Sequence, residues 1–196
     1  MTTNARFNRY LDATKGRPPR ETTLQALELF DEPGLAVDLG CGAGRDALPM
    51  LQRGWRVLGI DSNPEAIRRL AEAAGDDRNL QTQVAGYAEA EWPACELVNS
   101  SFALPFCPAA DFADVWRRIV ASLRPGGVFA GQLFGPNDDF AKRGIVVQTR
   151  AEVEALLDGL EIIRLDEVEE DGTTAVGEGK HWHIFHIVVR KPEEQP

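Results

Sequence analysis

The chain has 196 residues, and its 21 Lys and Arg residues against 31 Asp and Glu residues give a formal net charge of −10 at pH 7. This length suits one domain, and the 43% apolar fraction argues against a disordered chain, which lacks the apolar surface to offset its ordering entropy. The acidic balance argues against a nucleic acid partner, because proteins that bind duplexes carry a basic footprint for the phosphates.

Signals for membranes, export and metals are weak in this sequence. No apolar run approaches the ~20 residues of a transmembrane helix. Residues 1–11 lack the apolar stretch and cleavage site of a secretory signal, so we predict a cytoplasmic protein with no membrane partner. Cys41, Cys95 and Cys107 have no CxxC spacing, which indicates reduced thiols rather than a disulfide framework or a zinc site. The oligomeric state stays open.

Apolar strands alternate with amphipathic helices along the chain. In chain order, strands are predicted at about 35–39, 55–60, 80–85, 96–99, 128–134, 161–168 and 182–190. Helices are predicted at 64–75, where Ser62 and Asn63 before Pro64, with Glu65 three residues after Ser62, favour a capped start, and at 111–123. A capping box at Thr149 and Glu152 begins a shorter helix, and the last two strands are separated by a turn around residues 171–172.

This order predicts the fold class. Alternating β and α units followed by a terminal hairpin indicate an α/β fold: a Rossmann-like, seven-stranded, mostly parallel sheet with helices on both faces and one antiparallel C-terminal strand. We expect residues 1–196 to form a single domain. Ligands of such sheets bind beyond the carboxyl ends of the strands, so the loops after Leu39, Ile60, Ala85 and Asn99 should converge on one crevice.

A glycine-rich turn follows the first predicted strand. Residues 37–44, Val-Asp-Leu-Gly-Cys-Gly-Ala-Gly, let the backbone turn tightly and a ligand approach the N–H groups of the next helix. Asp61 ends the second strand, where a carboxylate can accept both hydroxyls of a ribose. Dinucleotide sites read GxGxxG, whereas this turn reads GxGxG, and Asp38 beside it would repel a pyrophosphate. A cationic nucleoside such as S-adenosylmethionine suits the turn better.

Residues 35–61 resemble motif I and the following acidic position of class I S-adenosylmethionine-dependent methyltransferases. Residues 44–48, Gly-Arg-Asp-Ala-Leu, and residues 180–186, Lys-His-Trp-His-Ile-Phe-His, are similar to the tellurite-resistance and thiopurine methyltransferase-like subgroup. The resemblance implies that S-adenosylmethionine is the methyl donor, S-adenosylhomocysteine the product and a small molecule the acceptor, without a metal. Asn99-Ser100-Ser101-Phe102 lacks the Asn/Asp-Pro-Pro-aromatic motif of enzymes that methylate adenine or glutamine amino groups.

The resemblance also implies a set of cofactor contacts. The backbone at the glycines would line the methionine part, Asp38 would lie near its ammonium, and Asp61 would hold the ribose. Tyr87 stands where many members have an acid for the adenine, so either Tyr87 frames the base or Glu89 takes over. The residues expected to bind the cofactor are Asp38, Gly40, Cys41, Gly42, Gly44, Asp61, Ser62, Gly86, Tyr87, Ser100 and Arg20.

Two segments are candidates for closing the acceptor pocket. Residues 1–20 carry five basic residues against one acid, and Phe7, Tyr10 and Leu11 share one side of a predicted helix. Such an arm could cover the cofactor, with Arg17 or Arg20 meeting its carboxylate or an anionic acceptor. A solvated arm is the alternative. The loop at 135–140 is a candidate lid or simply a polar loop.

Three histidines occur in the last strand. His181 and His183 share one face and His186 points to the other, which argues against a metal site. His181, near the end of the sheet, is a weak candidate for a general base, although strand histidines are often simply hydrogen-bonded. No other catalytic residue can be assigned.

Three functions are therefore compatible with the sequence. The first is methyl transfer to a small molecule. The second is a sensor or assembly partner that binds S-adenosylmethionine without acceptor chemistry, which the unusual Tyr87 leaves open. The third, a nucleotide-dependent oxidoreductase, is disfavoured by the glycine spacing and Asp38.

Overall fold

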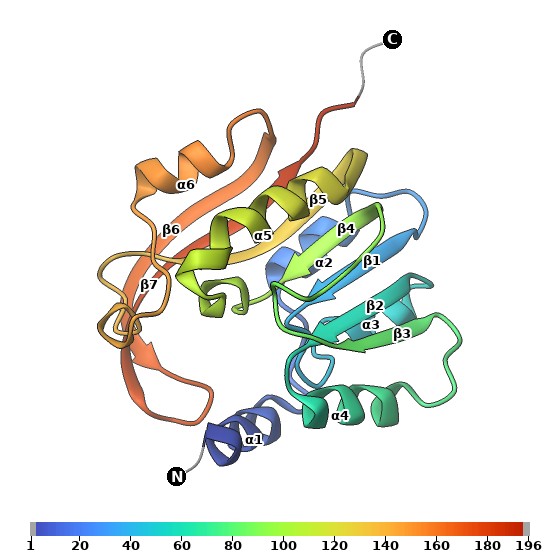
Figure 1. Cartoon of the computed structure of the whole chain (residues 1–196), viewed down its shortest axis with the longest axis horizontal. Coiled ribbons are helices and arrows are strands. Elements are labelled where there is room, and N and C mark those ends of the chain that lie inside the picture. Colours follow the sequence, from blue (N-terminus) through green and yellow to red (C-terminus); the bar gives the residue numbers. More distant parts are fainter. Residues whose placement is uncertain (1–2, 194–196) are drawn as a thin grey trace.

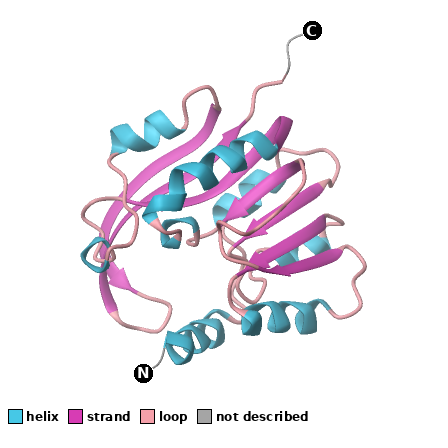
Figure 2. Ribbon diagram, viewed as in Figure 1, coloured by secondary structure: helices cyan, strands magenta, loops and turns pink. Residues whose placement is uncertain are grey.

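The computed structural model describes residues 3–193. Met1, Thr2 and the Arg6 side chain, all part of the predicted N-terminal arm, lie outside the described residues. The described chain forms one seven-stranded sheet with helices packed against it (Figure 1, Figure 2). Its strands are β1 (Leu35–Leu39), β2 (Arg56–Asp61), β3 (Leu80–Val84), β4 (Cys95–Ser100), β5 (Leu123–Phe134), β6 (Glu161–Thr173) and β7 (Gly179–Arg190).

The strand order is β3-β2-β1-β4-β5-β7-β6. Neighbouring strands from β3 to β5 pair in parallel, whereas β7 runs antiparallel to both β5 and β6. This confirms the predicted Rossmann-like sheet with one antiparallel C-terminal strand. The order reverses between β1 and β4, and such a switch point opens a crevice at the carboxyl ends of the two strands.

Helices cover both faces of the sheet, as predicted. They are α1 (Thr3–Thr14), α2 (Glu21–Leu27), α3 (Ala47–Gln52), α4 (Pro64–Ala74), α5 (Ala109–Ser122) and α6 (Arg150–Leu156), with 3₁₀ turns η1 (Leu104–Phe106) and η2 (Ala141–Arg143). One core cluster joins α2, α3 and α4 to the sheet through residues such as Met50 and Leu70, and a second joins α5 and α6 through Trp116 and Val153.

Local sequence explains where several elements begin. The Asn63 side chain accepts a hydrogen bond from the Glu65 N–H, 2.9 Å away, and caps α4 with Pro64 in its first turn. The capping box at Thr149 and Glu152 is present at the start of α6. These caps satisfy N–H groups that have no partner within the helix, so these starts could be predicted from sequence.

The terminal hairpin is longer than the sequence predicts, and the predicted turn around Asp171 and Gly172 is wrong. These residues pair with His181 and Lys180 inside the ladder, and the chain turns only at residues 174–178. Beyond Ile184, which pairs with the last residue of β5, strands β6 and β7 pair only with each other. The resulting ribbon is largely exposed, so its polar residues do not show the apolar pattern of a strand. It bends toward α1 in Figure 1.

Candidate functional site

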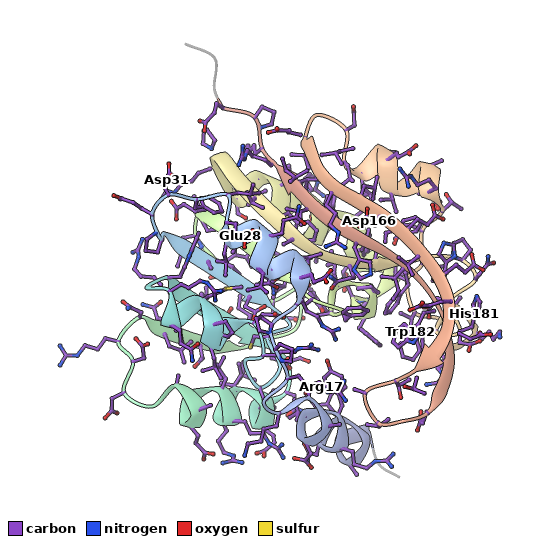
Figure 3. The ribbon with its side chains drawn as sticks, turned by 180° about the vertical axis from the view of Figure 1, so that it is seen from behind. Arg17, Glu28, Asp31, Asp166, His181 and Trp182 are labelled. Carbon is purple, nitrogen blue, oxygen red and sulfur yellow. The ribbon has the colours of Figure 1, made fainter. Side chains whose placement is uncertain are left out.

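A cavity of about 1010 Å³ lies at the carboxyl ends of the parallel strands. The loops after β1, β2 and β3 line one side, the loop after β4, the end of β5 and the β6–β7 hairpin line the other, and α1 lies between the two (Figure 1, Figure 3). The structure brings together nine of the predicted cofactor-binding residues here: Arg20, Asp38, Gly40, Cys41, Gly42, Asp61, Ser62, Gly86 and Tyr87.

The glycine-rich turn has the conformation that only glycine adopts without strain. Gly40 has φ +80°, and a Cβ there would lie 2.3 Å from the Ala103 Cβ in the loop after β4. Gly42 has φ +53°, and a Cβ there would make only an ordinary contact of 3.8 Å with the Leu11 Cδ2. Gly44 has another purpose, because its missing Cβ makes room for Leu70 of α4 and it does not line the cavity.

Asp61 is held in place by the backbone of two loops. Its Oδ2 accepts a hydrogen bond from the Gly42 N–H at 2.9 Å, and its Oδ1 accepts one from the Asn63 N–H at 2.8 Å. Burial raises the pKa of this carboxyl, and the two N–H donors oppose the shift. Each oxygen retains lone-pair capacity toward the cavity, so the carboxylate is preorganised to accept two further donors.

Asp38 is buried, and only one of its two carboxylate oxygens has a hydrogen-bond partner within the part of the chain that the structure describes. Its Oδ1 accepts a hydrogen bond from the Asn99 Nδ2 at 2.7 Å, whereas its Oδ2 is buried without a partner among the described residues. Burial, followed by the nearby Asp46 carboxylate, raises the pKa of Asp38 to about 8. An unpaired buried carboxylate oxygen costs about 1–3 kcal/mol, which a cationic group in the cavity would recover.

Two guanidinium groups approach the same end of the cavity. The Arg20 guanidinium lies 4.2 Å from the centre of the Phe102 ring, and no carboxylate of the described chain forms an ion pair with it. Burial and the neighbouring Arg45 lower the pKa of Arg20. The Arg45 Nη1 is buried without a hydrogen-bond partner. Because these guanidinium groups line the same cavity as Asp38, the cavity suits a zwitterion, which presents an ammonium and a carboxylate together.

Other predicted residues have different roles. The Tyr87 hydroxyl donates to the Ala103 carbonyl at 2.6 Å, so only its ring is available to frame a ligand. Ser100 is buried, donates to the Leu39 carbonyl and does not line the cavity, whereas its neighbour Ser101 does. Glu89 is also absent from the lining. The turn after β3 therefore offers no carboxylate to the cavity.

The structure does not bring His181 to the cavity. Its Nδ1 lies 2.7 Å from Asp171 and its Nε2 3.1 Å from Glu169, and these contacts raise its pKa. Figure 3 shows His181 on the outer side of the hairpin, while the neighbouring Trp182 lines the cavity. The geometry thus gives no support to His181 as a base.

The far side of the cavity is aromatic, a feature that the sequence analysis missed. Phe102, Phe106, Phe134, Phe140 and Trp182 form a connected cluster with ring centres 5.5–6.2 Å apart. We call these five residues the aromatic wall. The alternation of Trp182, Ile184 and His186 along β7, all of which line the cavity, was the available sequence signal.

A strained residue anchors this wall. Phe102 has φ +54°, the only positive φ outside glycine among the described residues. Its N–H donates to the Gln132 Oε1 at 3.0 Å, and the Gln132 Nε2 donates to the Thr22 hydroxyl at 2.9 Å. A strained backbone conformation of this kind is kept only where several surrounding contacts hold it in place. Residues with such conformations occur mainly at functional sites.

A buried ion pair supports the loop that carries Phe140. The Lys180 ammonium donates to Asp138, and the two side chains are 3% and 0% exposed. The same ammonium lies 3.5 Å from the centre of the Trp182 ring and 4.3 Å from that of Phe140. Asp138 also accepts hydrogen bonds from the Phe140 and His183 N–H groups. The loop after β5 is thereby tied to β7.

Helix α1 borders the cavity from the N-terminal side. Phe7, Tyr10 and Arg17 belong to the lining, and the Leu11 side chain is buried. Just after α1, the Arg17 Nη2 donates to the Ala175 carbonyl in the hairpin turn at 3.2 Å. The predicted arm therefore meets the hairpin across the cavity.

Residues 3–193 contain neither a candidate metal cluster nor a candidate membrane-spanning helix. No group of three or more His, Cys, Asp or Glu side chains in this range could hold a metal ion. No helix in this range is long and apolar enough to cross a membrane.

Residues 36–127 match the family model described as a methyltransferase domain. Trans-aconitate 2-methyltransferase of Azoarcus sp. (strain BH72) is 30% identical over 127 residues, which make up 63% of this chain and 48% of that protein. The chain spans about half the length of the curated relatives it matches.

Solved structures share the fold. TehB from Haemophilus influenzae has a TM-score of 0.76 at 18% identity, covering 88% of this chain and 62% of that one. A Burkholderia thailandensis 1,6-didemethyltoxoflavin-N1-methyltransferase, solved with 1,6-didemethyltoxoflavin and S-adenosylhomocysteine, has a TM-score of 0.69 at 20% identity, covering 97% and 89%. At these identities the likeness concerns the fold alone.

Proposed function

We propose that this chain is a class I S-adenosylmethionine-dependent methyltransferase, which its match to a methyltransferase domain over residues 36–127 supports, and that it transfers a methyl group from S-adenosylmethionine to a small-molecule acceptor. The observation that carries the proposal is the buried Asp38 Oδ2 without a partner, at the end of a cavity that also holds Asp61. A carboxylate there suits a cation and disfavours a pyrophosphate, which separates this donor from a dinucleotide.

The residues present fit this donor. Asp38 would hold the ammonium, Arg20 the carboxylate and Asp61 the ribose hydroxyls, while Gly40 and Gly42 allow close approach of the backbone. When bound, S-adenosylmethionine supplies a methyl group on a positively charged sulfur, which is already activated for displacement. The chain itself would contribute orientation and exclusion of water, because holding two reactants in line supplies much of such a rate.

The N-terminal arm completes the proposed domain. Residues 1–196 would form one methyltransferase domain in which residues 1–20 cover the bound donor and acceptor. The support is that α1 and the hairpin turn border one cavity and meet at the Arg17 to Ala175 hydrogen bond. Our proposal includes a cytoplasmic location, with neither a nucleic acid nor a membrane as partner and no metal.

Binding is the first test. Isothermal titration with S-adenosylhomocysteine should show a one-to-one complex, and Asp61→Asn should weaken it about 100-fold, because two charge-assisted hydrogen bonds are worth about 1.5–3 kcal/mol each. Asp76→Asn, an exposed change in the turn before β3, should leave the affinity unchanged. A wild-type protein that is folded but does not bind S-adenosylhomocysteine would overturn the proposal.

Activity separates an enzyme from a sensor that only binds the donor. Purified protein and radiolabelled S-adenosylmethionine should be incubated with a panel of thiols, selenite, tellurite, phenols and trans-aconitate, the last because the relatives carry its name. Label transfer to any of these supports the enzyme. Tight donor binding with no transfer to any acceptor would favour the sensor.

A further inference from the structure

His186 is an ionisable residue of the cavity lining that the proposed donor site does not use. It lies in β7, paired in register with Gln132 of β5 and Asp166 of β6, and it lines the cavity. Its ring centre is 6.3 Å from that of Phe102. None of the described side chains or backbone groups forms a hydrogen bond with its ring nitrogens, unlike those of His181 and His183. The imidazole is thus free to bond a ligand.

The surroundings of His186 favour the neutral ring. Burial lowers its pKa, and the charges of Arg164 and Arg20 lower it further, while Asp166 and Glu21 act in the opposite direction. These acids are already engaged, since Arg164 pairs with Asp166 at 2.7 Å and with Glu21 at 3.3 Å. A neutral imidazole has one nitrogen with a free lone pair and can therefore accept a proton near pH 7.

The space in front of His186 suits a flat ring. Phe102 contacts both Trp182 and His186 in edge-to-face geometry, and its backbone is held at positive φ by Gln132. The other members of the aromatic wall extend from Phe102 and Trp182 to Phe140. Aromatic rings pack favourably against one another at these spacings, which gives an aromatic acceptor affinity and orientation together.

We infer that the acceptor of the proposed methyl transfer is an aromatic hydroxyl compound, and that His186 is the general base that removes its proton. This inference rests on the proposed function. A carboxylate is already ionised at neutral pH and needs no base, and a thiol, with a pKa of about 8.5, already supplies a few per cent of a strongly nucleophilic thiolate there. A phenolic hydroxyl is neutral there, with a pKa near 10, and becomes a strong nucleophile only as its proton leaves.

The step balances without any other reactant. The hydroxyl proton passes to the free nitrogen of His186, and the acceptor oxygen forms a bond to the methyl carbon. The carbon–sulfur bond breaks, and its electron pair stays on sulfur, which becomes a neutral thioether. The positive charge of the sulfonium ends on the His186 imidazolium, which returns the proton to water when the site opens.

The test compares two histidines of the same strand that differ in which face they occupy. His186→Gln retains hydrogen bonding but cannot act as a base in this pH range, and His181→Gln is the matched control outside the cavity. With catechol as acceptor, His186→Gln should lower kcat about 100-fold or more, and His181→Gln should leave it unchanged. The wild-type rate should fall at low pH as His186 becomes protonated, with a midpoint below 6.5. The rate of His186→Gln should not show this fall at low pH.

A binding measurement gives a readout independent of turnover. The absorbance of 4-nitrophenol distinguishes its neutral form from the phenolate, so titration into the complex with S-adenosylhomocysteine reports both affinity and proton transfer. The wild type should bind it, and Phe106→Ala, which removes another ring of the aromatic wall, should weaken binding about 10-fold through loss of stacking area. Unchanged binding of S-adenosylhomocysteine by each variant shows that the donor site is intact.

Three results would overturn the inference while leaving the proposed function standing. One is donor binding without methylation of any phenol. Another is methylation of trans-aconitate or benzoate, but not catechol, at a rate independent of His186. A third is a catechol rate that His186→Gln leaves unchanged. Failure to bind S-adenosylhomocysteine at all would instead contradict the proposed function.

Discussion

The two sides of the cavity are built by different means. The side formed by the loops after β1 to β3 uses backbone N–H groups and buried carboxylates, with Asp61 fixed by two N–H donors before any ligand arrives. The opposite side uses five aromatic rings and one histidine, supported from behind by the Lys180–Asp138 pair and by strain at Phe102. Backbone N–H groups and buried carboxylates thus predominate on the first side and aromatic rings on the second, which also includes the charged residues Arg143 and Glu170.

This difference assigns specificity to the two sides. Under the proposed function, the first side recognises the donor through groups that are close in sequence and rigid. The second side gathers residues from the loop after β4 with η1, from β5 and the loop that follows it, and from β7, so changes in those segments can alter the acceptor. If this division holds, substitutions on the first side should change donor binding and substitutions on the second should change acceptor binding. Stability, measured separately, should identify the variants that affect folding.

The largest effect is expected at the support of the aromatic wall. Lys180→Met leaves the buried Asp138 carboxylate without its cation, and breaking such a pair costs about 3–5 kcal/mol. Lys142→Met removes the exposed partner of the adjacent Asp139 and should hardly change stability. Urea unfolding of both variants measures the contrast. Equal midpoints would mean that the buried pair does not support the loop.

The glycine-rich turn should show a smaller but graded effect. Gly40→Ala combines a positive φ with a contact of 2.3 Å to Ala103, and we expect a loss of about 2–4 kcal/mol together with loss of donor binding. Gly42→Ala has a positive φ but no close contact, so it should cost only about 1–2 kcal/mol. Unfolding and titration with S-adenosylhomocysteine check both. A Gly42 variant as unstable as the Gly40 variant would refute the steric explanation.

The buried acid on the donor side should make stability depend on pH. Because the pKa of Asp38 is raised to about 8 in the folded state, the folded protein binds this proton more tightly than the unfolded chain. Its contribution to stability is present at low pH and is lost as pH rises toward 8, by about 2 kcal/mol between pH 6 and 8. Urea unfolding across this range should show the loss in the ligand-free wild type.

Asp38→Asn removes this ionisable group, so the dependence of unfolding free energy on pH between pH 6 and 8 should become flatter in the variant. Saturating S-adenosylhomocysteine should reduce the same slope in the wild type, since its ammonium stabilises the ionised carboxylate. A profile that is identical in wild type and variant would show that Asp38 is not the titrating group.

The smallest effect is expected where the two sides meet. Arg17→Ala removes one exposed hydrogen bond between the residue after α1 and the hairpin, and should leave stability nearly unchanged. The dissociation rate of S-adenosylhomocysteine, measured by surface plasmon resonance, should rise about three-fold. Arg9→Ala, an exposed change on α1 outside the cavity lining, is the control. Equal rates in the two variants would argue against closure through Arg17.

The donor side could be predicted from sequence because its geometry is local. Alternating glycines after an apolar strand admit few conformations, and a residue at the end of a parallel strand must lie at the ligand-binding edge. Nine of the residues expected to bind the cofactor indeed line one cavity. The exceptions are Gly44, which packs against Leu70, and Ser100, which donates a hydrogen bond to the Leu39 carbonyl. Both contacts depend on neighbours that are distant in sequence.

The acceptor side could not be predicted in the same way. Alternation along the last strand separates His186 from His181, but it does not say which face meets a cavity. That choice follows from pairing with β5 and from the long β6–β7 ribbon, which carries His181 out into solvent. The sequence by itself therefore determined the sheet and the donor-binding turn, where each residue's role follows from its immediate neighbours. Only the tertiary structure decided the aromatic wall and the position of His186, because long-range strand pairing and buried charge place them.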